Sequence, residues 1–167
     1  MGLFDRVFKG GGKAQKAPKG PRVLSPADGE LVAIESVADP VFAEKTMGDG
    51  VAIVPAGGPL TAPVDGTLSA LFPTGHAFGV EAGDLSVMVH GGIDTVDLEG
   101  AGFEVVAVQG DAVTAGQTVV TMDADAVRAA GYDPTVMVVV LEAPTGMAMR
   151  KREPGPVKAG EPVIWFE

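Results

Sequence analysis

The chain has 167 residues and no cysteine, and its 24 glycines and 13 prolines predict one domain with many turns. The lack of cysteine excludes a disulfide scaffold and a thiolate metal site, and it fits a reducing compartment. The formal net charge of −10 disfavours nucleic acid as a partner, and no apolar run approaches the roughly 20 residues of a membrane span.

The first 22 residues differ in charge from the rest of the chain. They hold six Lys or Arg and one acid, so the other 145 residues carry a net charge of −15. Residues 1–8 place four apolar side chains on one helical face, and a glycine- and lysine-rich stretch follows. We interpret residues 1–22 as a flexible basic tail, in which residues 1–9 could also form an interfacial helix on an anionic membrane. No signal-peptide pattern is present, so we expect a cytoplasmic protein that is transiently at the inner face of the membrane.

From Val23 onward, short apolar runs alternate with turn residues, while helical periodicity is weak. This pattern predicts one all-β domain over residues 23–167, a sandwich or barrel of short strands. A single short helix is predicted at Ala124–Ala130, with Asp123 as its N-cap. The predicted strands are Gly29–Ile34, Val51–Pro55, Gly66–Leu71, Phe78–Glu81, Ser86–His90, Phe103–Ala107, Thr118–Asp123, Val136–Leu141 and Pro162–Phe166.

Two short sequence patterns each occur twice. P-A-D-G-E-L at 26–31 returns as P-V-D-G-T-L at 63–68, and V-T-A-G-Q-T-V at 113–119 returns as V-K-A-G-E-P-V at 157–163. The Asp-Gly and Ala-Gly pairs supply the positive-φ residues that tight hairpins need. The repetition predicts a duplicated hairpin, with turn chemistry recurring by chance as the alternative. The second pattern also resembles the hairpins of barrel-sandwich hybrid folds.

Both histidines of the chain lie in one stretch, residues 74–96. The apolar run at 87–89 predicts a buried strand, which delivers His90 to the turn at Gly91-Gly92. His76 comes fourteen residues earlier, a separation that suits a hairpin or two neighbouring strands. Two imidazoles could therefore meet on one sheet face.

The neighbours of these histidines indicate a site. Adjacent glycines let a ligand approach the backbone closely. Thr74 can hydrogen-bond His76, a backbone carbonyl near Gly92 could hold the Nδ1 proton of His90, and Asp94 could face the same opening. The plainer interpretation is that a histidine at a strand end is only a partly buried polar residue.

Several of these segments resemble one known family. V-M-V-H-G-G-I-D-T-V at 87–96 resembles the phosphorylated-histidine motif of the glucose-type enzyme IIA of the bacterial phosphoenolpyruvate:sugar phosphotransferase system. T-G-H-A-F matches the family's second histidine segment, and residues 40–55 and 62–68 match two further blocks. The resemblance covers the chain from about Val23 to its C-terminus. It departs at Gly91, where the family usually has a large apolar residue, which puts the shape of the apolar rim in question.

The resemblance implies a phosphoryl carrier of the barrel-sandwich hybrid fold that needs no cofactor for transfer. His90 would accept the phosphoryl group through Nε2 from the phosphorylated carrier protein HPr and pass it to the IIB domain of a sugar permease. His76 would hydrogen-bond a phosphoryl oxygen, with Thr74 orienting His76 from behind. The implied docking face has Phe42, Phe72, Phe78 and Met88 as apolar contacts and Asp39 and Asp94 as rim charges.

The resemblance further implies a regulatory role. The unphosphorylated form would bind targets such as glycerol kinase or a sugar permease, and phosphorylation would block that binding by adding negative charge. Zn²⁺ could join such a complex through His76 and His90, with the partner and a water completing a tetrahedral site.

Two other protein classes share the hybrid fold. H-G-G-I-D at 90–94 resembles the first zinc motif of a family of peptidases, but these also need an H-x-H pair, and only His76 remains. G-M-A-M-R-K at 146–151 resembles the biotinylation hairpin of biotinyl and lipoyl carrier domains, with Arg150 in place of the lysine. Met and Ala at this spacing are more often strand core.

Overall fold

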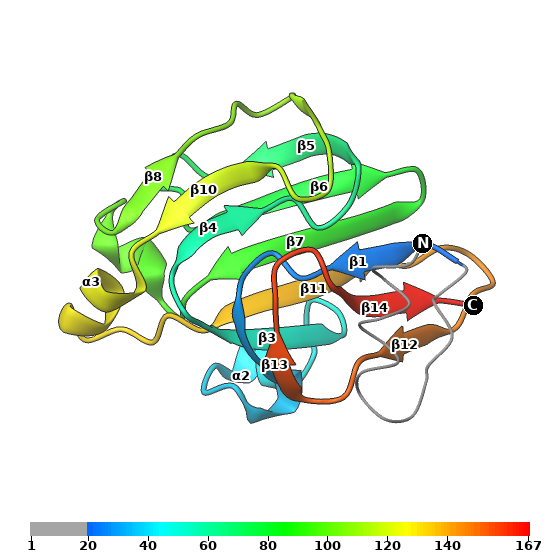
Figure 1. Ribbon diagram of the computed structural model, residues 1–167, viewed down its shortest axis with the longest axis horizontal. Helices are drawn as coiled ribbons and strands as arrows, with labels where there is room; N and C mark the ends of the chain where they lie inside the picture. Colours follow the sequence, from blue (N-terminus) through cyan, green and yellow to red (C-terminus); the bar gives the residue numbers. More distant parts are fainter. Residues whose placement is uncertain (1–19) are drawn as a thin grey trace.

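The computed structural model describes residues 20–167, which form strands joined by tight turns and four short helical segments (Figure 1). The helical segments are α2 (Pro40–Ala43), α3 (Ala124–Ala129) and the 3-10 helices η1 (Ile34–Ser36) and η2 (Thr95–Leu98). The strands are β1 (Arg22–Leu24), β2 (Gly29–Ala33), β3 (Gly50–Pro55), β4 (Gly58–Thr61), β5 (Gly66–Leu71), β6 (Ala77–Ala82), β7 (Leu85–Gly91), β8 (Phe103–Val105), β9 (Ala112–Val113), β10 (Thr118–Met122), β11 (Val136–Glu142), β12 (Met149–Lys151), β13 (Gly155–Val157) and β14 (Pro162–Phe166).

The strands form one large antiparallel sheet and two small ones. The large sheet has eight strands in the order β13-β2-β3-β11-β7-β6-β5-β9. The small sheets have the orders β4-β10-β8 and β1-β14-β12, and in the view of Figure 1 the first of them overlaps β5 and β6. One core cluster contains buried side chains from all three sheets, so the predicted all-β fold with packed sheets is confirmed.

The predicted tail lies mostly outside the described residues. The interfacial helix expected over residues 1–9 is within the part that the structure does not describe. β1 begins at Arg22, the last residue assigned to the tail, and Arg22 pairs opposite Trp165 of β14. In residues 20–167, no helix is long and apolar enough to span a membrane.

All nine predicted strands are present, and their ends differ from the prediction by two residues at most. The helix α3 is confirmed, and its N-cap Asp123 accepts a hydrogen bond from the Ala126 N–H at 3.0 Å. The missed strands are β1, β4, β9, β12 and β13, which are too short to show alternation. The missed helix α2 does carry a start signal, since Asp39 caps the Val41 N–H and Pro40 follows.

The repeated sequence patterns are structurally equivalent, but the expected hairpins are corrected, because the two strands that flank each pattern lie in different sheets. Asp28 Oδ1 accepts a hydrogen bond from the Ala159 N–H at 2.8 Å, and Asp65 Oδ1 accepts one from the Ala115 N–H at 2.7 Å. In parallel, β2 pairs with β13 and β5 pairs with β9, each in antiparallel orientation. Each Asp-Gly segment is therefore fastened to one Ala-Gly turn, which confirms the predicted duplication.

The large sheet is covered on both faces near its centre. Val136 and Val138 of β11 lie in the core shared by the three sheets. The alternate residues Met137 and Val139 face the other side, where they form a second cluster with Phe42 of α2. The segment that contains η1 and α2 therefore packs on the outer face of the sheet.

This second cluster sets the surroundings of β7. Val87, Val89 and Gly91 are buried toward the main core, while Met88 and His90 between them are half-buried. Successive side chains of a strand point to opposite faces, so His90 lies on the outer face, beside α2.

The duplication makes a matched pair of stability predictions. Asp28→Ala and Asp65→Ala should each lower the free energy of unfolding by about 1 kcal/mol, because each removes one side-chain bond to a turn amide. Urea denaturation measures both values. Asp125→Ala is the control, since that side chain is 98% exposed and its loss should cost less than about 0.5 kcal/mol. A loss in only one of the two repeats would contradict their equivalence.

Candidate functional site

Strands β6 and β7 bring the two histidines together. Ala77 pairs opposite His90, and His76 directly precedes Ala77 at the start of β6. The centroids of the two imidazole rings are 5.3 Å apart, with an interplanar angle of 77°. The prediction that two imidazoles meet is confirmed.

The ring of His90 is held by the backbone that follows it. His90 Nδ1 lies 2.7 Å from the Gly92 carbonyl oxygen, as the sequence predicted. A carbonyl oxygen only accepts hydrogen bonds, so Nδ1 carries the proton in the neutral ring. Nε2 then keeps its lone pair and can act as a nucleophile.

The ring of His76 is held by a hydroxyl group. His76 Nδ1 lies 2.7 Å from Thr74 Oγ1, which confirms the predicted contact, and the His76 side chain is buried. When the Thr74 hydroxyl donates this bond, His76 carries its proton on Nε2. The two rings then have opposite tautomers, so one offers a lone pair and the other an N–H donor.

Two aromatic side chains flank the histidines. The Phe42 ring of α2 lies 5.0 Å from the His90 ring, measured between centroids. The Phe72 ring lies 4.9 Å from the His76 ring in an edge-on arrangement. Phe42 is 5% exposed and Phe72 is 48% exposed, so Phe42 forms a wall of the site and Phe72 forms part of its rim.

The other expected docking residues are divided between surface and core. Met88 is half-buried on the outer face, whereas Phe78 is 1% exposed and belongs to the main core. The expectation that Phe78 contacts a partner is therefore corrected: Phe78 pairs opposite Val89, which also faces inward. Sequence reasoning missed two exposed valines on neighbouring elements, Val41 of α2 at 44% and Val96 of η2 at 52%.

Burial and nearby charges act in opposite directions on the histidines. Burial lowers the pKa of His90 below its ordinary value of 6.5, while the Gly92 carbonyl, Asp39 and Asp94 each act to raise that pKa. The pKa of His76 is lowered by burial and by the neighbouring His90. Both shifts favour the neutral form of the ring.

The structure explains the effect of Gly91. A Cβ atom at this position would lie 3.1 Å from Phe103, 3.2 Å from Leu60 and 3.3 Å from the His76 carbonyl oxygen. Leu60 and Phe103 belong to the main core or pack against it, so they lie on the core side of β7, whereas the His76 carbonyl oxygen accepts the Gly91 N–H within the sheet. The absence of a side chain at Gly91 therefore alters the packing below the site, and the expected change in the apolar rim is corrected.

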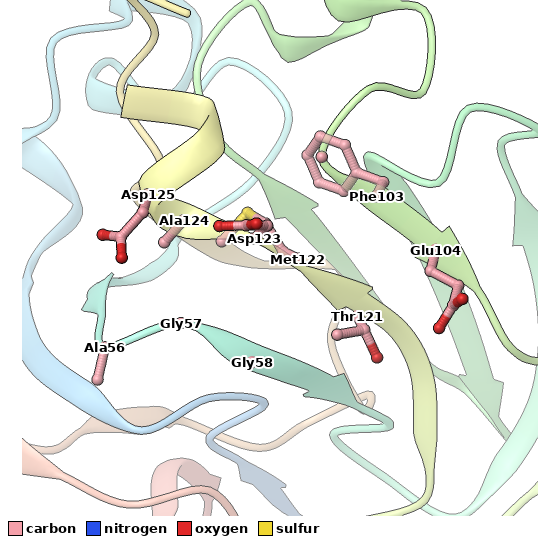
Figure 2. A pocket seen from close by; sticks show the side chains of 11 residues that line it. Ala56, Gly57, Gly58, Phe103, Glu104, Thr121, Met122, Asp123, Ala124 and Asp125 are labelled. Atoms are coloured by element: carbon pink, nitrogen blue, oxygen red, sulfur yellow. The ribbon is translucent and has the colours of Figure 1, made fainter. Parts of the chain in front are cut away.

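A hollow of about 620 Å³ lies between β4, β10 and the start of α3 (Figure 2). Neither histidine lines it. Two of its three carboxylates have local partners, because Asp123 caps α3 and Asp125 pairs with Arg128 at 3.3 Å. We therefore assign no function to this hollow.

The structure does not favour the two alternative classes. Among residues 20–167 there is no group of three or more His, Cys, Asp or Glu that could hold a metal ion, whereas a catalytic zinc usually takes three protein ligands. The biotinyl-like segment runs from the turn at Gly146 into strand β12, which contains Arg150 and Lys151. There Arg150 Nε donates to Glu167 at 2.6 Å, and Lys151 Nζ donates to Asp49 at 2.9 Å.

Comparisons with known proteins agree on one family. The model of the phosphoenolpyruvate-dependent sugar phosphotransferase system, EIIA 1, matches residues 21–145. The glucose-specific EIIA component of Haemophilus influenzae is 39% identical over 165 residues, which cover 98% of this chain and 97% of that protein. The solved structure of glucose permease IIA from Mycoplasma capricolum superimposes with a TM-score of 0.82 at 36% identity, covering 87% of this chain and 95% of that one.

A longer relative contains a matching segment. The glucose-specific EIICBA component of Streptococcus pneumoniae is 49% identical over 147 residues, covering 87% of this chain. The aligned segment is 20% of that protein, so the chain spans about a fifth of the length of this relative.

The electrostatic arrangement predicts how the histidines titrate. Both imidazoles should titrate below pH 6.5, and Asp39→Asn should lower the pKa of His90 further by removing a negative charge while keeping an N-cap for α2. A pH titration followed by the ¹⁵N shifts of the rings measures both values. Asp125→Asn should leave both pKa values unchanged, because Asp125 is not among the charges that shift either ring. A rise in the pKa of His90 in the Asp39 variant would contradict this assignment.

Proposed function

Because this chain belongs to the EIIA 1 family of the phosphoenolpyruvate-dependent sugar phosphotransferase system, we propose that it carries a phosphoryl group on Nε2 of His90. The observation that supports this choice of atom is the 2.7 Å contact between His90 Nδ1 and the Gly92 carbonyl oxygen, which leaves Nε2 unprotonated. The proposed donor is phosphorylated HPr, and the proposed acceptor is the IIB domain of a glucose-type permease.

The transfer step needs no group beyond the two proteins. The lone pair of His90 Nε2 forms a new P–N bond while the P–N bond to the donor's histidine breaks, and the electron pair of that bond stays on the donor. The proton stays on Nδ1, and its hydrogen bond to the Gly92 carbonyl oxygen stabilises the positive charge that the ring gains. In the next step the phosphoryl group leaves Nε2 for a cysteine of IIB. Such transfers depend mainly on positioning and on electrostatic stabilisation of the equatorial oxygens.

His76 is the proposed stabilising group. With Thr74 on Nδ1, its Nε2–H can donate to a phosphoryl oxygen at the neighbouring ring. A neutral imidazole donates one hydrogen bond without a fixed positive charge, so it does not hold the phosphoryl group too tightly to pass on. This role agrees with the buried, neutral state of His76.

The glucose specificity and the partners are proposals that rest on the relatives. The names of the Haemophilus influenzae and Streptococcus pneumoniae proteins both give glucose as the sugar. A regulatory role would use the same face, because a phosphoryl group adds nearly two negative charges there. Zinc could take part only in a complex, since two imidazole nitrogens are fewer than the four ligands of a tetrahedral site.

Histidine substitutions test the proposed carrier role. His90→Gln should abolish labelling by phosphorylated HPr, because the amide cannot form the P–N bond. His76→Gln should still be labelled but should transfer to IIB at least about tenfold more slowly, through loss of a transition-state hydrogen bond. Labelling is measured with ³²P-phosphoenolpyruvate, enzyme I and HPr. Full labelling of His90→Gln would refute the choice of His90.

Charge substitutions test the rim. The double variant Asp39→Asn, Asp94→Asn should slow labelling by phosphorylated HPr at low salt, because rim charges mainly steer the encounter with a basic partner. The difference from the unchanged protein should shrink at about 1 M salt, where the Debye length is about 3 Å. Stopped-flow or quenched labelling measures both rates. The double variant Asp125→Asn, Asp111→Asn, which removes two carboxylates that do not act on His90, is the control for net charge. An equal deficit at both salt concentrations would exclude steering as the cause.

A further inference from the structure

The backbone that holds His90 is itself held by a turn from another part of the chain. This turn, Asp133-Pro134-Thr135, connects α3 to β11. The Ile93 N–H donates to the Asp133 carbonyl oxygen at 2.9 Å, and the Gly92 N–H donates to the Thr135 carbonyl oxygen at 2.9 Å. Two carbonyls of one turn therefore fix the two residues that follow the strand end at Gly91.

The side chain of Asp133 fixes that turn. Its Oδ1 accepts hydrogen bonds from the Thr135 N–H at 2.9 Å and from the Thr135 hydroxyl at 2.6 Å. Thr135 is 7% exposed, and the intervening Pro134 has a fixed φ. Asp133 is exposed, yet both of its side-chain bonds point into the turn. The carboxylate therefore fixes the conformation of the turn whose Asp133 and Thr135 carbonyls accept hydrogen bonds from the loop after β7.

A single peptide group connects the catalytic ring to this turn. The Gly92 carbonyl accepts from His90 Nδ1 at 2.7 Å, and the N–H of the same peptide, on Ile93, donates to the Asp133 carbonyl. Hydrogen bonds at the two ends of one amide polarise each other in the same sense. Displacing the turn would therefore weaken the bond that sets the tautomer of His90.

On its other side, the loop after His90 packs so closely against Thr95 that Gly92 has little room to shift. Gly92 has a φ of +89°, and a Cβ atom there would lie 2.3 Å from Thr95 Cγ2 and 3.0 Å from the Asp133 carbonyl oxygen. The Thr95 hydroxyl also donates to the Gly91 carbonyl at 2.6 Å. Hydrogen bonds from Thr95 of η2 on one side and to the Asp133 turn on the other therefore fix the loop after His90.

We infer that Asp133 is a positioning residue for phosphoryl acceptance: its carboxylate holds the Asp133–Thr135 turn, which keeps the Gly92 carbonyl on His90 Nδ1. The inference rests on the proposed function of His90. It assigns Asp133 no contact with the phosphoryl group, and its negative charge is not required. An amide oxygen at the same position would accept the same two bonds.

Three variants in the full chain separate geometry from charge. Asp133→Ala removes the oxygen that accepts both bonds, and Asp133→Asn keeps an acceptor oxygen but removes the charge. Asp65→Ala is the control that loses a comparable side-chain bond to a turn amide in the duplicated segment. Two readouts are taken: the ¹⁵N spectrum of the His90 ring in the unphosphorylated protein, and the initial rate of labelling by phosphorylated HPr.

Asp133→Ala should lower the share of the Nδ1–H tautomer of His90 and slow labelling about two- to tenfold, the effect of losing one modest hydrogen bond. Asp133→Asn and Asp65→Ala should match the unchanged protein in both readouts. Thr135→Val, which removes only the hydroxyl donor, should shift both readouts in the same direction by a smaller amount. If circular dichroism shows that Asp133→Ala is unfolded, Thr135→Val takes its place as the variant that tests the inference.

The inference is overturned if the His90 spectrum of Asp133→Ala, or of Thr135→Val where the first variant is unfolded, equals that of the unchanged protein. It is also overturned if Asp133→Ala and Asp133→Asn slow labelling equally, since charge would then be the cause. Failure of the proposed function looks different: the unchanged protein is not labelled on His90, while the ring spectrum still responds to Asp133→Ala.

Discussion

The hydrogen bond between His90 Nδ1 and the Gly92 carbonyl determines which chemistry the site can perform. It places the ring proton on one nitrogen and so leaves the other as a nucleophile. The acceptor comes from only two residues further along the chain, so the strand must turn sharply after Gly91. Gly92, with a positive φ and no space for a side chain, allows that turn. The remaining features of the site serve to keep this short segment and its ring in place.

Burial favours the uncharged form of the His90 ring. The outer face of the large sheet is covered by α2, so His90 lies against Phe42 in surroundings that disfavour a positive charge. Asp39 and Asp94 lie at the edge of this covered region and oppose that effect. The result is a neutral acceptor ring with negative charges around it, an arrangement that suits a basic protein partner more than a free anion.

Eight of the predicted strands could be found from sequence because each is an apolar-rich run of five to seven residues between turn signals, whether it alternates in burial, as β7 does, or is buried almost throughout, as β11 is. The strands that were missed have two to four residues and show no period. Phe78 was expected on the docking face from the family resemblance and its closeness in sequence to His76, but strand alternation beginning at Ala77 turns its side chain into the main core. His76, however, precedes the first residue of β6, so the alternation does not extend to it. The hydrogen bond between Ile93 and the Asp133 carbonyl joins residues that are far apart in the sequence, so no local sequence pattern could predict it.

The pairing of β1 with β14 has a consequence for proteins that contain this domain as one part. Arg22 and Trp165 are neighbours, and Leu85, at the start of β7, lines the same hollow as Gly20 and Arg22. His90 lies toward the other end of β7, five residue steps or roughly 17 Å away. A covalent tether attached at either end of the described chain would therefore leave the histidines uncovered. The length of such a tether would set the local concentration at which an attached acceptor domain meets the phosphoryl group.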